Sequence, residues 1–317
     1  MDLLEPMSKT HLPVNPYPRI AVLLAAYNGA EFIDEQISSI TAQRQADVQL
    51  FVSVDASSDG TEACVSAWLA DNPQITLLPT GQRFGGAAPN FFRLINDVDL
   101  STFDYVSFSD QDDRWYPSKL WRAYQILKTQ EAAGYSSNVL AFWPDGTRCE
   151  INKAQPQTPW DFLFEAAGPG CTYVLRQDLA LSLQTWVRAN RQALQNVYLH
   201  DWLIYAFARA NGHRWVIDDN INMGYRQHSA NQVGVNSGWR AFKYRADKVL
   251  SGWAFNQSLT IAHLLKLDTL PFVRRWKSGG RLGMLSLAFH ARQCRRRPRD
   301  QLLFALSCLI AAVWGRR

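Results

Sequence analysis

The sequence has 317 residues, of which 47% are hydrophobic, so it can bury a sizeable core and is not a disordered chain. The net charge of +5 is unevenly placed, because residues 269–317 carry 11 Lys/Arg and one acid, Asp300, for a local charge of +10. A basic character confined to the C-terminus argues against a nucleic-acid-binding domain and for a basic tail with its own partner. The five cysteines are odd in number and include no CxxC pair, which argues against a zinc site or a disulfide framework and fits a reducing compartment.

Residues 1–18 are polar and rich in proline, without the apolar run of a signal peptide, and are predicted to form a loose arm. The chain then alternates short apolar runs with helical spacing. Strands are predicted at 19–26, 48–54, 75–78 and 105–108, and helices between them at 31–42, 61–70 and 90–96. This order predicts an α/β fold, a doubly wound and mostly parallel sheet flanked by helices. Because ligands bind beyond the carboxyl ends of such strands, the polar loops there are expected to converge on one face.

The second half of the chain mixes predicted helices and strands without the regular alternation of the first half. Helices are predicted at 121–130, 179–189 and 200–210, and strands at 139–142, 168–175 and 215–218. From about residue 238, helical stretches combine Trp, Phe and Leu with an excess of Lys/Arg. We therefore expect an N-terminal arm at 1–18, a main domain at 19–237, and a C-terminal helical, basic and apolar extension at 238–317.

The C-terminal extension contains a 13-residue apolar run, Leu302–Trp314, flanked by arginines at 295–297 and 316–317. It is shorter than the roughly 20 residues that span a bilayer. One interpretation is a helix packed on the main domain or in an oligomer interface. The other, which we favour, is a peripheral anchor on an anionic cytoplasmic leaflet.

An acidic segment follows the fourth predicted strand and reads Asp110-Gln111-Asp112-Asp113. Three carboxylates within four residues repel one another unless a cation balances them. Mg²⁺ in proteins is commonly shared between one or two carboxylates and substrate phosphates. The alternative is a solvated turn that caps the next helix.

Three further clusters carry candidate chemistry. Asp55 ends a predicted strand, where it can accept an N–H from a pyrimidine base, whereas Asp59 is interpreted as a helix cap. Asp201 begins an apolar helix: exposure there would lower its pKa, but burial beside aromatic residues would raise it to a value useful for a general base, and capping is the alternative. In Tyr225–His228, Arg226 could pair with a diphosphate, and His228 could bind a metal or a phosphate.

These segments, in this order, resemble family 2 glycosyltransferases with the Rossmann-like GT-A fold. The resemblance rests on A-A-Y-N-G at 25–29, D-A-S-S-D-G-T at 55–61, F-S-D-Q-D-D-R-W at 108–115, H-D-W at 200–202 and Y-R-Q-H at 225–228. The acidic segment and the last motif are most similar to bacterial rhamnosyltransferase-like members, which act in O-antigen and other cell-surface polysaccharide assembly.

The resemblance implies a role for each matching residue. Tyr27 and Asp55 would contact the base, and Asp110 the ribose or the metal's water shell. Asp112 would coordinate Mg²⁺ or Mn²⁺, and Asp201 would be the catalytic base. Arg226 and His228 would close over the diphosphate, with His228 a candidate metal ligand.

The expected activity is metal-dependent, inverting transfer from a nucleotide-diphosphate sugar to a saccharide or lipid-linked saccharide. The enzyme is expected in the cytoplasm at the inner face of the membrane, with peripheral contact to anionic lipid and no nucleic-acid partner. One alternative is a nucleotidyltransferase, but Tyr27-Asn28-Gly29 is not the glycine-rich loop with lysine that such an enzyme would use. The other is a nucleotide-sugar-binding protein with a degenerate transferase fold, against which Asp112 and Asp201 argue.

Overall fold

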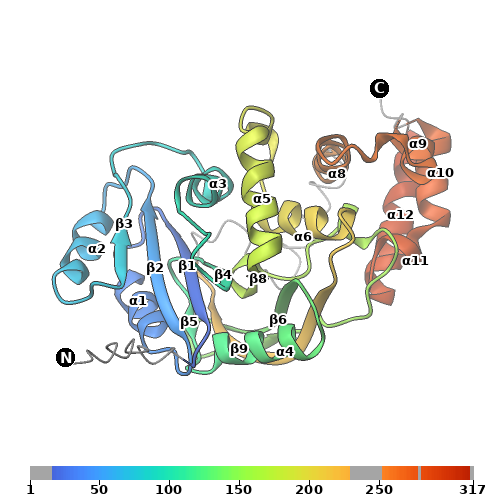
Figure 1. Cartoon of the computed structure of the whole chain (residues 1–317). Coiled ribbons are helices and arrows are strands. Elements are labelled where there is room, and N and C mark those ends of the chain that lie inside the picture. The colour runs from blue at the N-terminus through green and yellow to red at the C-terminus, as the bar shows by residue number, and fades with distance from the viewer. Residues whose placement is uncertain (1–15, 229–251, 278–279, 315–317) are drawn as a thin grey trace, which may run out of the picture.

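A computed structural model describes residues 16–228, 252–277 and 280–314 (Figure 1). Most of the predicted arm, and the predicted boundary at 237/238, lie outside these residues. The strands are β1 (Arg19–Ala26), β2 (Asp47–Val54), β3 (Ile75–Leu77), β4 (Tyr105–Ser109), β5 (Arg114–Trp115), β6 (Gly134–Phe142), β7 (Arg148–Ile151), β8 (Val174–Arg176) and β9 (Trp215–Arg226). The helices are α1 (Ile33–Thr41), α2 (Thr61–Leu69), α3 (Ala87–Asp97), α4 (Lys119–Thr129), α5 (Gln177–Ala189), α6 (His200–Ala210), α8 (Trp253–Leu264), α9 (Pro271–Lys277), α10 (Arg281–Phe289), α11 (Ala291–Cys294) and α12 (Pro298–Trp314).

Within the described residues the strands form one nine-stranded sheet in the order β3-β2-β1-β4-β8-β6-β9-β5, with β7 paired to β6. Strands β3, β2, β1 and β4 are mutually parallel, as predicted from the alternating pattern. The other half is mixed: β8 runs antiparallel to β4 and β6, β9 runs parallel to β6, and β5 runs antiparallel to β9. The sheet is therefore a parallel half joined to a mixed half.

Strand β1 shows why its sequence is continuously apolar. Ile20, Val22 and Leu24 face a core shared with α1, α2 and α4, whereas Ala21 and Leu23 face the core of α3, α5 and α6. Alternate side chains of a strand point to opposite faces, so a strand covered on both sides needs apolar residues throughout. Two helical layers therefore enclose the sheet.

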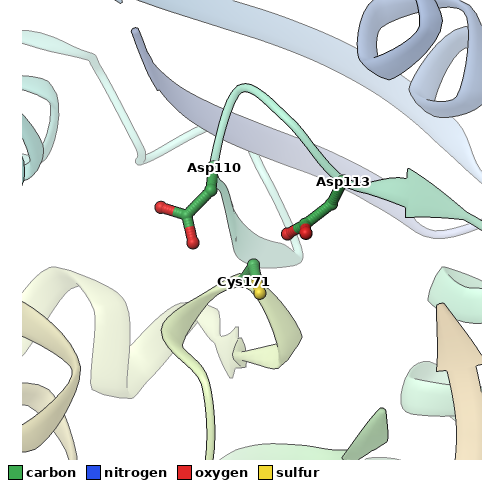
Figure 2. A group of neighbouring side chains, drawn as sticks. All are labelled: Asp110, Asp113 and Cys171. Carbon is green, nitrogen blue, oxygen red and sulfur yellow. The ribbon is translucent and has the colours of Figure 1, made fainter. Parts of the chain in front are cut away.

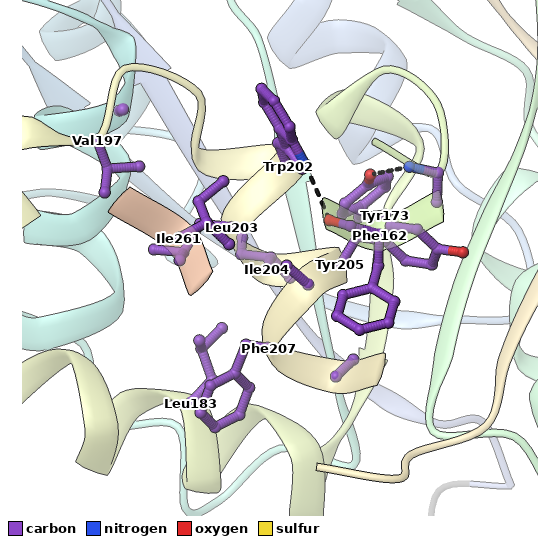
Figure 3. Close-up of a cluster of buried hydrophobic side chains, with 14 of the residues drawn as sticks. Phe162, Tyr173, Leu183, Val197, Trp202, Leu203, Ile204, Tyr205, Phe207 and Ile261 are labelled. Atoms are coloured by element: carbon purple, nitrogen blue, oxygen red, sulfur yellow. Dashed lines mark hydrogen bonds between the residues drawn. The ribbon is translucent and has the colours of Figure 1, made fainter. Parts of the chain in front are cut away.

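The core beside α6 is rich in aromatic side chains (Figure 3). The Trp202 indole N–H donates to the carbonyl oxygen of Phe162 at 2.9 Å, and the Tyr173 hydroxyl accepts the N–H of Ala167 at 3.0 Å. The first bond joins the first turn of α6 to Phe162, and the second lies within the segment before β8. Both satisfy polar groups that burial would otherwise penalise.

Three strand predictions were wrong in their bounds: the strand predicted at 139–142 is the end of β6, which begins at Gly134. The strand predicted at 168–175 is instead a 3-10 turn, Gly170–Thr172, followed by the short β8, because Gly168 has a φ of +142° and Pro169 follows it. The strand predicted at 215–218 continues to Arg226. Its buried polar residues are paired inside the protein: Asp218 accepts hydrogen bonds from Arg122 and from the Tyr135 hydroxyl, and Asn222 donates to that hydroxyl. Neither β5 nor β7 was predicted.

The C-terminal helices α9, α10, α11 and α12 gather at the end of the molecule opposite α1 and α2 (Figure 1). Their buried side chains, among them Trp276 and Leu287, join the core that α3, α5 and α6 share. Arg296, between α11 and α12, has a fully buried side chain that pairs with buried Asp161 at 2.9 Å. The pair connects the segment between α11 and α12 to the main domain, and removing one partner would leave a buried charge, at a typical cost of about 3–5 kcal/mol.

No helix in the described part of the chain combines the length and apolarity needed to cross a membrane. All five cysteines lie within the described residues, and there they are free thiols.

Candidate active site

The predicted donor-side residues follow strands that end at one edge of the sheet. Ala26 of β1 lies beside Val54 of β2, and Leu24 lies beside Ser109 of β4. Tyr27, Asp55 and Asp110, which follow these strands, therefore share the carboxyl edge of the parallel half. This is the edge at which ligands bind in open α/β sheets.

Gln111 ties the loop after β1 to the acidic segment. Its side-chain amide accepts the backbone N–H of Tyr27 at 2.6 Å and donates to the Tyr27 carbonyl oxygen at 2.8 Å. A side chain at Gly29 would meet this amide, since a Cβ there would lie 2.3 Å from Gln111 Oε1. The Tyr27 side chain stays 52% exposed and available for stacking. Sequence reasoning missed Gln111, because an amide between acids gives no distinct signal.

Asp55 is buried, and both of its carboxylate oxygens accept backbone hydrogen bonds. The N–H groups of Phe84 and Gly85 donate to them at 2.8 and 2.9 Å. Asp55 thus orders the glycine-rich loop before α3, and any base contact would use its remaining lone pairs. The predicted N-cap assignment of Asp59 was off by one position, because the N-cap of α2 is Gly60; Asp59 instead accepts the N–H of Thr61, the first residue of α2, and that of Ala30.

The acidic segment lies over the buried Cys171 thiol (Figure 2). Figure 2 shows the carboxylates of Asp110 and Asp113 on either side of Cys171, and ligand atoms of these three residues lie within 4.8 Å of one another. Burial, followed by the negative charges of Asp112 and Asp201, raises the pKa of Asp110 to about 7. Burial also raises the pKa values of Asp113 and Cys171, so the thiol is neutral near pH 7.

Asp112 and His228 face each other across the edge of the sheet. His228 Nε2 lies 2.7 Å from Asp112 Oδ2, and the imidazole packs against the Phe32 ring at 4.9 Å between centroids. The two predicted metal ligands are therefore neighbours, although they are 116 positions apart in the sequence.

Arg226 holds the acidic segment from the end of β9. Its backbone N–H donates to Asp113 and its Nε donates to the Asp112 carbonyl oxygen at 2.8 Å. The guanidinium also pairs with Glu35 of α1 and lies over the rings of Phe32 and Phe142, 4.8 and 4.7 Å from their centroids. In this conformation Arg226 is committed to the protein, so its predicted diphosphate contact would need the Glu35 pair to open. Sequence reasoning missed Glu35.

Lys119 lies buried behind the acidic segment, and sequence reasoning did not single it out. Its Nζ is 3.4 Å from the centroid of the Trp115 ring and has no hydrogen-bond partner among the described residues. Burial lowers the pKa of Lys119 to about 7, while the negative charge of Asp113 acts in the opposite direction. The Lys119 head group therefore lies against the face of the Trp115 ring, in a cation–π arrangement when it is protonated.

Asp201 lies in the first turn of α6, where its carboxylate accepts the N–H of Trp202 at 2.7 Å. Burial raises the pKa of Asp201 to about 6, against the lowering effects of that hydrogen bond and of the Lys153 charge. The direction is the one that the sequence predicted for an aspartate buried beside aromatic residues. Gly170 lies against Asp201, and the next residue, Cys171, lies beside Asp110, so the two carboxylates flank the same turn; the charge of Asp201 accordingly raises the pKa of Asp110.

His200, next to Asp201, has a structural environment. Its ring stacks on Phe91 at 3.9 Å between centroids, and burial lowers its pKa to about 3. Gly170 must lack a side chain, because a Cβ there would lie 2.6 Å from His200 Nε2 and 3.0 Å from the Cβ of Asp201. The close approach of Gly170 places the 168–170 turn directly against the acid.

The structure therefore brings the predicted residues into one region. Asp110, Asp112, Arg226 and His228 meet at the centre of the carboxyl edge, and Asp201 approaches from α6. Tyr27 and Asp55 lie along the same edge, towards β2. Four further residues contact this region or lie behind it: Gln111, Glu35, Cys171 and Lys119.

Comparison with known structures identifies the fold. The chain aligns with TarS of S. aureus, solved in complex with UDP-GlcNAc, with a TM-score of 0.52 and 14% identity over 93% of this chain and 89% of that one. It also aligns with the mannosyltransferase PcManGT of Pyrobaculum calidifontis, solved with GDP-Man and Mn²⁺, with a TM-score of 0.52 and 15% identity over 94% and 88% of the two chains. The expected GT-A fold is thereby confirmed.

Sequence comparison identifies the family. The glycosyl transferase family 2 model matches residues 21–170. The chain is 41% identical to the dTDP-rhamnosyl transferase RfbG of Shigella flexneri over 90% of this chain and 99% of that protein. It is 27% identical to the amylovoran biosynthesis glycosyltransferase AmsB of Erwinia amylovora over 36% and 37% of the two chains. From the motifs at the carboxyl edge, the fold and this end-to-end similarity, the chain belongs to glycosyl transferase family 2.

Proposed function

We propose that this glycosyltransferase moves rhamnose, with inversion, from dTDP-rhamnose to a saccharide or lipid-linked saccharide during cell-surface polysaccharide biosynthesis. The 41% identity to a dTDP-rhamnosyl transferase supports the choice of sugar and nucleotide. A lipid-linked acceptor would place the enzyme at the cytoplasmic face of the membrane. The notion of a nucleotidyltransferase has no support in these similarities.

The observation that carries the reaction type is the carboxylate of Asp201 beside the acidic segment. Its pKa of about 6 lets it be ionised at neutral pH and still hold a proton better than an ordinary aspartate. We assign Asp201 the role of base. It takes the proton from an acceptor hydroxyl as that oxygen bonds to the anomeric carbon, and the bond from this carbon to the diphosphate oxygen breaks. One displacement of this kind inverts the anomeric configuration.

Asp112 and His228 fit a divalent metal better than the neighbouring trio does. The Asp112 carboxylate and the His228 imidazole share a hydrogen bond of 2.7 Å, and with the proton between them lost they would offer Mn²⁺ an oxygen and a nitrogen ligand, whereas Mg²⁺ would use the carboxylate. In the trio, Asp113 and Cys171 are fully buried, and the neutral thiol is a poor ligand for a hard cation. When bound, the metal would offset the negative charge of the diphosphate. We place Asp110 at the ribose or the metal's water shell.

The remaining donor contacts follow from position along the edge. The exposed Tyr27 ring is proposed to stack on the base, and Asp55 to accept its N–H. Arg226 is proposed to reach the diphosphate by exchanging its Glu35 partner for phosphate oxygens, a charge-assisted exchange that a guanidinium favours.

Donor choice tests the proposal. With dTDP-rhamnose, UDP-GlcNAc and GDP-mannose offered separately, we expect the enzyme to release nucleoside diphosphate from dTDP-rhamnose fastest, slowly without acceptor and faster with it. Chromatographic detection of the free nucleotide gives the rates. Release from none of the donors would favour a protein that only binds nucleotide sugars, and preference for another donor would overturn the choice of sugar.

Activity is expected to fall on the acid side at a higher pH than for an ordinary aspartate. Asp201 acts when ionised and its pKa is raised from 3.8 to about 6, so kcat/KM for the acceptor should drop about tenfold per pH unit below about 6. Initial rates in mixed buffers would show this limb. Donor affinity at each pH is the control, because Asp110 titrates close by. A rate that stays level until pH approaches 4 would contradict the assignment of the base.

A further inference from the structure

Helices α10 and α12 expose large apolar side chains along one side each. Leu282, Phe289 and Val313 are 82%, 87% and 72% exposed. Along both helices such residues recur at steps of three or four positions, which places them on one face. The exposed apolar face comprises Leu282, Leu285 and Phe289 of α10 and Leu302, Leu303, Leu306, Leu309, Ile310 and Val313 of α12.

The other sides of α10 and α12 are packed against the rest of the protein and against each other. Met284 and Leu287 of α10, and Cys308 and Ala312 of α12, are buried in the core, and α10 packs against α12. The exposed residues are therefore additional to those that attach the helices to the protein. A helix that is apolar on both sides buries both, and soluble monomers rarely expose a contiguous patch of this kind.

Positive charge accompanies the apolar face. Arg281 precedes Leu285 by one turn on α10, and Arg299 precedes Leu302 and Leu303 by one turn on α12, so each arginine shares the side of its helix that carries the leucines. Both arginines are exposed, as are Arg274 and Arg275 of α9. In the sequence from 269 to 317, Asp300 is the only acid against 11 Lys/Arg.

We propose that this face of α10 and α12 lies on an anionic lipid leaflet, with its apolar side chains among the acyl chains and its arginines at the phosphates. No described helix is long and apolar enough to cross a membrane, which fits two short helices lying in the interface. A second copy docked by two-fold symmetry would instead bring the arginines near their own copies, with little acidic charge to balance them.

The lipid-facing surface would have a fixed orientation relative to the active site. Arg296, just before α12, pairs with Asp161 and donates to the carbonyl oxygen of Ala166 at 2.7 Å. This segment leads to Gly170, which lies against Asp201. The face of α10 and α12 is thereby joined through buried contacts to the segment that packs against Asp201. Deleting the helices would remove Arg296 and leave Asp161 buried with one fewer partner, so substitutions on the face are the sound test.

The experiment is vesicle flotation with the full-length protein and no substrates. We expect binding to mixed phosphatidylcholine–phosphatidylglycerol vesicles that exceeds binding to phosphatidylcholine alone and weakens with salt. The triple variant Phe289→Gln, Leu306→Gln, Ile310→Gln should lose binding at least tenfold, because it removes apolar groups from the acyl region. Circular dichroism and thermal melting would verify that it folds.

The charge component has a matched control. Arg281→Gln with Arg299→Gln should weaken binding by about fivefold per arginine. Arg44→Gln with Arg148→Gln removes the same charge from exposed sites on the main domain and should leave binding unchanged. Equal losses in both pairs, or absence of wild-type binding, would overturn the proposal. The proposal would also be overturned if the wild-type protein formed a dimer and bound no vesicles, and if the triple variant were monomeric.

This inference rests on the proposed function only through the lipid-linked acceptor, and the two can fail separately. Vesicle binding without rhamnose transfer would leave the surface standing and remove the donor assignment. Rhamnose transfer to a soluble acceptor without vesicle binding would support the donor assignment and overturn the lipid-facing surface.

Discussion

Replacing Asp201 with asparagine is expected to lower the transfer rate by about 10²–10⁴-fold while leaving donor affinity nearly unchanged. Asparagine has the same shape, and its Oδ1 can still accept the N–H of Trp202 that Asp201 accepts at 2.7 Å. It cannot take a proton from the acceptor hydroxyl. The measurement is kcat with saturating donor and acceptor, beside the dissociation constant of the donor from calorimetry.

A second aspartate supplies the control. Asp178 occupies the first turn of α5 as Asp201 does in α6, and it pairs with Arg176 at the surface. Asp178→Asn should change kcat by less than about twofold, because exposed ion pairs are worth little. If Asp201→Asn instead weakens donor binding and leaves kcat intact, the residue contacts donor and is not the base.

The parallel half of the sheet could be predicted from the sequence because its signals are local. The strand predicted at 19–26 is β1, residue for residue, because Ile20–Ala26 is covered on both faces and is apolar throughout. The polar residues of β9 gave no such pattern. Asp218 is tolerated there because Arg122 and Tyr135, from α4 and β6, supply its partners. Those partners lie more than 80 positions away in the sequence, so only the folded structure shows that they meet Asp218.

The residues of the candidate site also fall into two groups, those with a local sequence signal and those identified only by long-range contacts. Asp112, Asp201 and His228 could be named because acids after a strand or at a helix start, and a motif in family order, are sequence features. The bond between Gln111 and Tyr27 spans 84 positions, and the pair between Arg226 and Glu35 spans 191. Nothing local marks Gln111 or Glu35.

The position of Arg226 matters for how the donor would be received. Its guanidinium already contacts the Asp112 carbonyl oxygen and Glu35, so the diphosphate contact proposed for Arg226 would have to compete with a carboxylate. That competition would make donor binding sensitive to Glu35, a residue far from the motifs. The acidic segment is thus braced by β9 before any ligand arrives.

Asp112→Ala is expected to abolish the Mg²⁺ or Mn²⁺ dependence of donor binding and to reduce transfer by roughly 10³-fold, the scale of several kcal/mol of charge stabilisation by a metal. Asp112 pairs with His228 at 2.7 Å, and without the carboxylate the imidazole alone would be left to hold the ion. Titration calorimetry with dTDP-rhamnose, with metal and with chelator, measures the effect.

The matched substitution is Asp71→Ala, which removes an exposed carboxylate from the loop before β3, away from the site. It should keep both the metal dependence and the rate. Asp112→Asn sharpens the test, because it preserves the shape of the side chain and a bond to His228 while removing the charge. If Asp112→Asn binds donor as strongly with metal as the wild type does, Asp112 serves only to orient His228. The ion would then have to be held by Asp110, the one member of the neighbouring trio that is not fully buried.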